Sequence, residues 1–118
     1  MKNNVIEYKG QKYELVFNLN VMEQIQEEYK TIDKWGELTD GSKGEPNAKA
    51  IIFGLAAMIN EGIDIENEEK GYKDGSEKKP LTLKQVGRML SEVGLKEATE
   101  KLNNTVIEST ETDKSKNE

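Results

Sequence analysis

The residue types that most often carry chemistry are rare in this chain of 118 residues. It has no cysteine, which excludes disulfides and thiolate chemistry, and no histidine, the side chain most used for proton transfer near neutral pH. An enzyme would have to rely on carboxylates, lysines, tyrosines or hydroxyls, and none of these forms a recognisable catalytic motif. We therefore expect a protein that is not an enzyme and that binds no cofactor.

One acidic stretch has the alternation of a cation site. Asp64, Glu66 and Glu68 are spaced like the early ligands of a calcium-binding loop. Counted from Asp64, however, the sixth position is Glu69, where such a loop needs glycine, and the twelfth is Gly75, where it needs a bidentate glutamate. We therefore expect a solvated acidic loop and no metal site.

The charges are unevenly distributed along the chain. There are 17 basic and 23 acidic residues, a net charge of −6, and seven of the acids lie with only two lysines between Glu61 and Glu77. An acidic surface repels nucleic-acid phosphates and anionic membranes. Lys84 and Arg88 stand one helical turn apart and could hold a carboxylate or a phosphate, but exposed basic pairs are ordinary on helices. We expect no nucleic-acid partner and no membrane partner.

Long hydrophobic runs are not found in the sequence. No apolar run approaches the roughly 20 residues of a spanning helix, and the amino end, MKNNVIEYKG, lacks the apolar core of a signal peptide. Together with the lack of cysteine, this predicts a soluble, unexported protein that is compatible with a reducing cytoplasm.

The elements that would position a binding site follow from the apolar periodicity. An N-terminal hairpin is expected over 5–18, with Gly10 at the first central position of a type II′ turn. A lone hairpin is marginal in water, so its apolar face must lie on helices. Helices are predicted near 20–30, 32–38, 46–61, 82–93 and 95–108, with cap signals at Asn20, Thr31 and Thr82.

The fold class expected from this order is α+β. A single domain would span 1–108, with the hairpin packed on about four mostly short α-helices, an acidic loop over 63–80 and a disordered tail over 109–118. The central helix should begin with Pro46 and end at Gly62, because proline suits the first helical position and glycine suits the left-handed cap.

The central helix is apolar on both sides. One broad face is expected to form the core, and it consists of Ala48, Ile51, Ile52, Leu55, Met58 and Ile59. The opposite face carries small residues around one aromatic ring: Ala50, Phe53, Gly54 and Ala57. A single domain with few helices can hardly cover both faces. Either the hairpin or the short turn at 32–38 folds over the second face, or this face binds another copy or a helix of a partner.

Trp35 is the only tryptophan of the chain and leaves the same two alternatives open. It either forms a lid on the small core or serves as an anchor for a partner, because tryptophan is enriched at binding hot spots. As a protein-binding site the sequence therefore predicts Ala50, Phe53, Gly54, Ala57 and Trp35.

Four segments in this order resemble a known family. They are YELVFNLNVMEQIQEEY, TIDKWGEL, KAIIFGLAAMINEG and LTLKQVGRMLSEVGL. Spaced as they are over residues 5 to 108, they resemble the small tail assembly chaperones of long, non-contractile-tailed phages and prophages of Gram-positive bacteria. The extended acidic insertion before Pro80 is a departure from that family's pattern.

The resemblance implies a function without catalysis. Members of the family bind the tape measure protein, a long helical chain, and keep it soluble until tail tube subunits polymerise around it. A longer, frameshifted form is thought to recruit the tube subunits, and this chain would match the short form. The resemblance also implies self-association along the client, a location in the cytoplasm of the infected or lysogenic bacterial host, and absence from the mature virion.

Two other functions fit the sequence. The protein could be a structural virion component, such as a tail tube or connector subunit, in which hairpin edges pair between copies. It could also be an acidic inhibitor that mimics DNA against a host nuclease. The inhibitor would need negative charge spaced along a rigid face, whereas the acidic residues are expected in one flexible loop.

Overall fold

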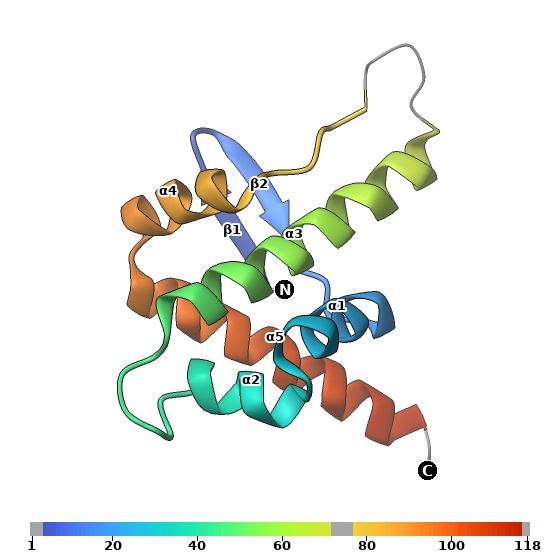
Figure 1. The fold of residues 1–118 in the computed structure, drawn as a ribbon. Helices are drawn as coiled ribbons and strands as arrows, with labels where there is room; N and C mark the ends of the chain where they lie inside the picture. The colour runs from blue at the N-terminus through green and yellow to red at the C-terminus, as the bar shows by residue number, and fades with distance from the viewer. Residues whose placement is uncertain (1–3, 72–76, 117–118) are drawn as a thin grey trace.

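Seven elements follow one another in the computed structural model, which describes residues 4–71 and 77–116, with side chains described as far as residue 109. They are β1 (Val5–Tyr8), β2 (Gln11–Glu14), α1 (Leu19–Tyr29), α2 (Ile32–Thr39), α3 (Ala48–Lys70), α4 (Leu83–Val93) and α5 (Leu95–Lys116). The expected α+β class, a hairpin packed on helices, is confirmed. Helix α3 runs through the middle and contacts β2 and all four other helices (Figure 1).

The hairpin forms with a different turn from the one predicted. Its closing pair is Tyr8 with Gln11, so the two turn residues are Lys9 and Gly10. Both have positive φ, 51° and 78°, which is the pattern of a type I′ turn. The predicted type II′ turn with Gly10 in first place is therefore wrong by one residue. Lys9 accepts the unfavourable conformation because this turn matches the right-handed twist of the strands.

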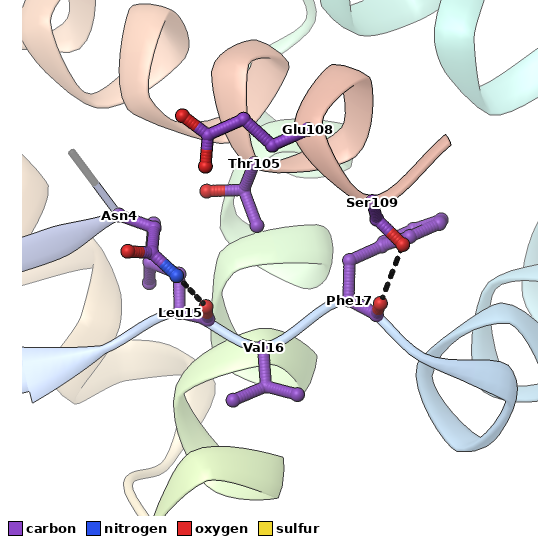
Figure 2. A pocket seen from close by; sticks show the side chains of 7 residues that line it. All are labelled: Asn4, Leu15, Val16, Phe17, Thr105, Glu108 and Ser109. Carbon is purple, nitrogen blue, oxygen red and sulfur yellow. Dashed lines mark hydrogen bonds between the residues drawn. The ribbon is translucent and has the colours of Figure 1, made fainter. Parts of the chain in front are cut away.

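The second strand ends at Glu14, earlier than the predicted 18, opposite Val5, where β1 begins. Leu15 donates its backbone N–H to the Asn4 carbonyl (2.7 Å), and the Asn4 side-chain amide donates to the Leu15 carbonyl (2.8 Å). The next residue, Val16, donates to the Met58 carbonyl of α3 (3.3 Å). Figure 2 shows this extended segment passing between α5 and α3, where the Ser109 hydroxyl donates to the Phe17 carbonyl (3.0 Å).

The helix caps were predicted correctly in two cases and wrongly in a third. Thr31 accepts from the Lys34 backbone N–H (3.0 Å), and Thr82 forms a capping box with Gln85. The predicted cap Asn20 is wrong, since Asn18 caps α1 by accepting from the Val21 N–H (3.2 Å). The Asn20 side chain instead donates to a carboxylate oxygen of Glu61 (3.0 Å), which ties α1 to α3.

Helix α3 is longer than predicted at its C-terminal end. Its N-cap is Asn47, whose side chain accepts from the Ala50 N–H (2.9 Å), and it ends at Gly71, which has the left-handed φ of 59°. The prediction that it spans 46–61 and ends at Gly62 is therefore wrong. The predicted acidic loop over 63–80 is helical as far as residue 70, with Ile63 buried, while its residues 72–76 lie outside the described part.

Helix α5 also extends beyond its predicted end at 108. It continues to Lys116, so residues 109–116 are helical where a disordered tail was predicted, and 117–118 lie outside the described part. Buried Leu102 fixes the first turns of this helix against the core. Adding residues to a helix that is already nucleated costs little free energy, so the polar end can continue it.

Two glycines let other elements approach α3 closely. A Cβ atom on Gly54 would lie 2.4 Å from Cζ2 of Trp35, and a Cβ on Gly62 would lie 2.6 Å from the Glu14 carbonyl oxygen. Both distances are far inside van der Waals contact. Gly62 therefore serves the close approach of the last residue of β2 and does not end the helix, which explains why the termination signal was misread.

The segment before α4 is fastened to α3 by two asparagines. The Asn60 side chain donates to the Leu81 carbonyl (3.0 Å) and accepts from the Leu81 N–H (2.8 Å). Asn67 makes the same pair of bonds with Lys78, at 2.9 and 3.1 Å. Seven helical residues span about 10.5 Å and three extended residues span about 10 Å, so both clamps form in one register. The clamps fix where α4 begins.

Replacing Gly54 by alanine should destabilise the protein. The new methyl group would overlap the Trp35 ring, and overpacking of this kind lowers the free energy of unfolding by about 1–3 kcal/mol. The matched control is Gly87→Ala in α4, where the Cβ would lie at an ordinary 3.6 Å from Cδ1 of Ile52. That change should stabilise by up to about 1 kcal/mol through helix propensity. Urea unfolding followed by Trp35 fluorescence measures both, and equal effects would contradict the packing argument.

Removing either asparagine clamp should expose one backbone amide selectively. Asn60→Ala should cost about 1–2 kcal/mol of unfolding free energy, because two hydrogen bonds to Leu81 are lost. The backbone amide of Leu81 should then exchange its hydrogen faster, while the backbone amide of Lys78 stays protected. Asn67→Ala should produce the reverse pattern. Hydrogen exchange by NMR tests this, and loss of protection at both amides in both variants would show that the segment is held as one unit.

Candidate protein-binding surfaces

Four of the five predicted binding residues lie in the core. Ala50 and Gly54 are buried, and Ala57 and Trp35 are only 4% and 2% exposed. Helix α2 folds over this side of α3, with the Trp35 indole N–H donating to the Ala50 carbonyl (3.0 Å). The predicted outer binding face is therefore wrong for these four residues. The alternative that the segment 32–38 covers the face within one subunit is what the structure shows.

The fifth predicted residue, Phe53, stays at the surface. It is half-buried, and its ring makes an edge-to-face contact with Tyr29, with ring centroids 5.7 Å apart and an interplanar angle of 77°. Helix α2 reaches the Gly54 side of α3 and leaves the neighbouring Phe53 at the edge of the covered surface. The predicted site is thus reduced to Phe53. The residues around Phe53 that were not predicted decide what this surface can bind.

Phe53 lines a hollow of about 520 Å³ between α3, α4 and the end of α1, which we call the α3/α4 groove. It is lined by Glu28, Lys49, Ile52, Phe53, Leu83, Lys84 and Gly87. The apolar lining comes from Ile52, Phe53 and Leu83, and the Leu83 side chain is 53% exposed. Gly87 keeps the wall low because it has no side chain. The groove has the shape and chemistry to receive apolar side chains.

Charged residues border the α3/α4 groove. Lys49 lies 4.0 Å from a Glu28 carboxylate oxygen, and its side chain is 80% exposed, so this ion pair contributes little to stability. Lys84 lies on the α4 side of the groove and is exposed. Lys84 and Arg88, considered together in the sequence, do not share a site, because Arg88 lines a separate hollow with Tyr8 of the hairpin.

A second hollow, of about 550 Å³, lies between α2 and α5, and we call it the α2/α5 groove. It is lined by Ile32, Asp33, Trp35, Gly36, Glu37, Thr39, Asp40, Asn103, Val106 and Ile107. Ile107 is 53% exposed. The Ser42 backbone N–H donates to Asp40 (2.8 Å) and, with the Ser42 side chain, holds the pKa of this carboxyl below its usual range. Asp40 is therefore charged at neutral pH.

The third hollow is smaller and its walls are already bonded to each other. It encloses about 280 Å³ beside the extended segment 15–17 (Figure 2). The Asn4 amide and the Ser109 hydroxyl both point at backbone carbonyls of that segment. The Thr105 hydroxyl is bonded to the Lys101 carbonyl (2.7 Å). This hollow is a structural seam between α5 and the hairpin.

The acidic residues once considered for calcium lie on α3. Glu66 pairs with Lys70 and Lys78, both at 3.2 Å, and its bonds to these two ammonium groups lower the pKa of the Glu66 carboxyl. Over the described residues, no cluster of three acidic side chains is placed to hold a metal ion. Residues 63–70 are helical, so the acidic side chains expected in a flexible loop, a loop that counted against a DNA mimic, lie on a rigid element. Lys70 and Lys78 neutralise part of their charge.

Sequence reasoning missed most of the α3/α4 groove. Leu83 was not among the predicted binding residues and Ile52 was assigned to the core face of α3, although both line the groove. Gly87 was the available signal, since a glycine inside a helix often marks a close approach or a hollow. Glu28 could not be found, because its nearness to Lys49 depends on how α1 packs on α3.

Comparison with known proteins gave no relatives. No family model matches the chain, and neither the curated proteins nor the solved structures yield a match. The resemblance to phage tail assembly chaperones therefore stays a prediction. Within residues 4–71 and 77–116, none of the helices has the length and apolarity that a membrane crossing requires.

Tyr29, which supports Phe53, has a buried hydroxyl oxygen for which the described residues supply no hydrogen-bond partner. Burial, and next the charge of Glu28, raise the pKa of Tyr29. Tyr29→Phe should therefore leave the free energy of unfolding unchanged or raise it by about 1 kcal/mol.

The Tyr29 hydroxyl also makes the free energy of unfolding depend on pH. The unfolded tyrosine ionises near pH 10, whereas the folded one holds its proton to higher pH. The contribution of Tyr29 to stability is thus complete below about pH 10 and is lost as the pH rises through the folded-state pKa. Above pH 10 the parent should lose stability relative to Tyr29→Phe. Urea unfolding of both proteins at neutral and alkaline pH measures the difference, and parallel pH curves would contradict the burial argument.

Proposed function

We propose that this protein is a non-enzymatic assembly chaperone which binds a helical segment of a partner chain in the α3/α4 groove. In accordance with the resemblance of its sequence, the partner is the tape measure protein of a long, non-contractile phage tail, which it keeps soluble until tail tube subunits polymerise around it. The observation that carries the proposal is the half-open apolar groove formed by Ile52, Phe53 and Leu83.

The groove suits an amphipathic helix. Such a helix presents apolar side chains three or four residues apart along one face, and a shallow hydrophobic groove between helices is a common way to bind them. Leu83 is half exposed, whereas Val86, Met89 and Leu90 of the same helix are buried, so Leu83 is available for a partner. A long client with many similar stripes would offer many such sites, and each copy of the chaperone would cover one of them.

The composition of the chain supports a binding role over catalysis. With no histidine and no cysteine, the protein lacks the residues most used for acid–base and nucleophilic chemistry. The candidate surface is built of aliphatic and aromatic side chains, and its charged residues lie at the rim. Surfaces of this composition bind apolar segments of other proteins.

The proposal predicts that co-expression of the chain with the adjacent tape measure protein raises the soluble yield of that client and that the two co-purify. Leu83→Asp should abolish both the gain in soluble yield and the co-purification, because an aspartate in the groove loses its hydration against the apolar surface. We expect affinity to fall at least about tenfold. The fold should tolerate the change, since Leu83 is the first residue of α4 and a negative charge favours a helix N-terminus.

The matched control is Leu19→Asp, which alters a leucine that is 79% exposed and does not line either groove. It should co-purify with the client as the parent does. A client that stays insoluble with the parent protein would remove the proposal. Mass spectrometry of purified particles adds a second test, because stoichiometric amounts in finished particles would indicate a structural virion component instead.

A further inference from the structure

We propose that a small hollow between the hairpin and α4 binds the C-terminal carboxylate of a peptide whose last side chain is apolar. The hollow encloses about 250 Å³, and we call it the hairpin/α4 pocket. It is lined by Tyr8, Lys9, Tyr13, Leu81, Gln85, Arg88 and Met89. It shares no described lining residue with the α3/α4 groove, so it is a separate site and its test is independent of the proposed function.

The hairpin/α4 pocket is cationic in an acidic protein. Lys9 and Arg88 line it, and no aspartate or glutamate is among its described lining residues. No ion pair between residues that the structure describes includes either cation. Glu92, one helical turn after Arg88, is exposed and does not line the pocket. Although the net charge of the chain is −6, the pocket therefore attracts an anion.

Arg88 suits a carboxylate better than a lysine would. It is the only arginine among the 17 basic residues of the chain. A guanidinium is planar and presents parallel N–H donors that match the two oxygens of a carboxylate, whereas an ammonium is a point charge. Gln85, three residues before Arg88, adds a further donor. Its Oε1 accepts from the Thr82 N–H (2.8 Å), which holds the side chain in place and leaves the Nε2 amide to donate.

Lys9 has a backbone conformation that lysine does not favour. Its φ is 51°, at the first turn position of the hairpin, where asparagine and glycine are the preferred residues. Residues held in such conformations cluster at binding and active sites. The Lys9 ammonium lies over the Tyr8 ring, 5.4 Å from its centroid, at the wall of the pocket. Lysine at this position thus costs stability and gives the pocket its second cation.

The hairpin register supplies an aromatic wall without acidic residues. Tyr8 and Tyr13 lie on the same face of the hairpin as buried Ile6, because side chains alternate along both strands. The same alternation directs Glu7 and Glu14 to the opposite face. The face toward the pocket is therefore apolar and aromatic apart from the tyrosine hydroxyls.

The combination of apolar wall and cations indicates a C-terminal residue as the ligand. Leu81 and buried Met89 complete the apolar wall. A C-terminal residue carries its carboxylate and its side chain on the same Cα atom, so both can enter one small hollow together. An internal aspartate or glutamate uses its side chain for the carboxylate and leaves no apolar group for the tyrosines. Capture of a chain end by its carboxylate is an established mode of peptide recognition.

The probe is an acetylated Ala-Ala-Ala-Leu peptide with a free C-terminal carboxylate, titrated up to about 10 mM into the isotope-labelled protein and followed by NMR. The backbone amide signals of Lys9, Gly10 and Arg88 should shift and reach saturation. The same peptide with a C-terminal amide should bind at least about tenfold more weakly, because the carboxylate is lost. An acetylated Ala-Ala-Ala-Glu amide, which carries its carboxylate on the side chain, should also bind at least about tenfold more weakly.

Two variants test the cations. Arg88→Lys keeps the charge and removes the planar fork, so the affinity for the free-acid peptide should fall at least about tenfold. Lys9→Asn should also weaken binding, but it should raise the midpoint of urea unfolding, because asparagine accepts positive φ at this turn position. Higher stability with lower affinity distinguishes a role in binding from a role in folding. The matched control Lys12→Asn makes the same change on the opposite face of the hairpin and should bind like the parent.

Absence of saturable binding by the free-acid peptide overturns the proposal. Equal binding of the two Ala-Ala-Ala-Leu peptides also does so, because the carboxylate would then have no role. Tighter binding of the Ala-Ala-Ala-Glu amide would assign the pocket to acidic side chains instead. Unchanged affinity in both Arg88→Lys and Lys9→Asn, or an equal loss in Lys12→Asn, would show that the peptide binds elsewhere on the protein.

Discussion

The structure depends on one constraint, which is that helix α3 must be covered by protein over most of its circumference. Gly54 admits the Trp35 ring on one side, and Gly62 admits the backbone of Glu14 on another. A side chain at either position would overlap its neighbour and force the two elements apart. The buried positions of α3 therefore face α2 and β2 as well as α4 and α5, and a small domain can bury a helix that is hydrophobic nearly all round.

The same coverage determines which part of α3 remains available. The Trp35 indole is bonded to the Ala50 carbonyl and stacks at 6.4 Å between ring centroids with Phe17, so α2 is held over the Gly54 side. Phe53, next along the helix, is left at the boundary between α1 and α4. The proposed binding surface is the part of α3 that the other elements leave uncovered. A groove of this origin is apolar because its residues belong to the outer edge of the core.

What the sequence could predict was set by local interactions. The presence of an N-terminal hairpin and the caps at Thr31 and Thr82 depend on residues close in the chain, and these predictions agree with the structure. Gly62 was misread because glycine serves both helix ends and close approaches, and only the path of β2 decides between them. The binding face failed for a related reason, since periodicity shows that a face is apolar but not which element covers it.

The extension of α3 to Lys70 was predicted as a loop because its composition is polar, and it has a structural role at the groove. Its Asn67 lies two turns beyond Asn60, and together they hold the segment before α4 by four hydrogen bonds to backbone. A helix set by apolar contacts alone could slide along its neighbour, because those contacts are not directional. Hydrogen bonds to Lys78 and Leu81 fix the register and so place Leu83 over Ile52 and Phe53. An acidic, water-facing helical end thereby determines the geometry of an apolar site more than one helical turn away.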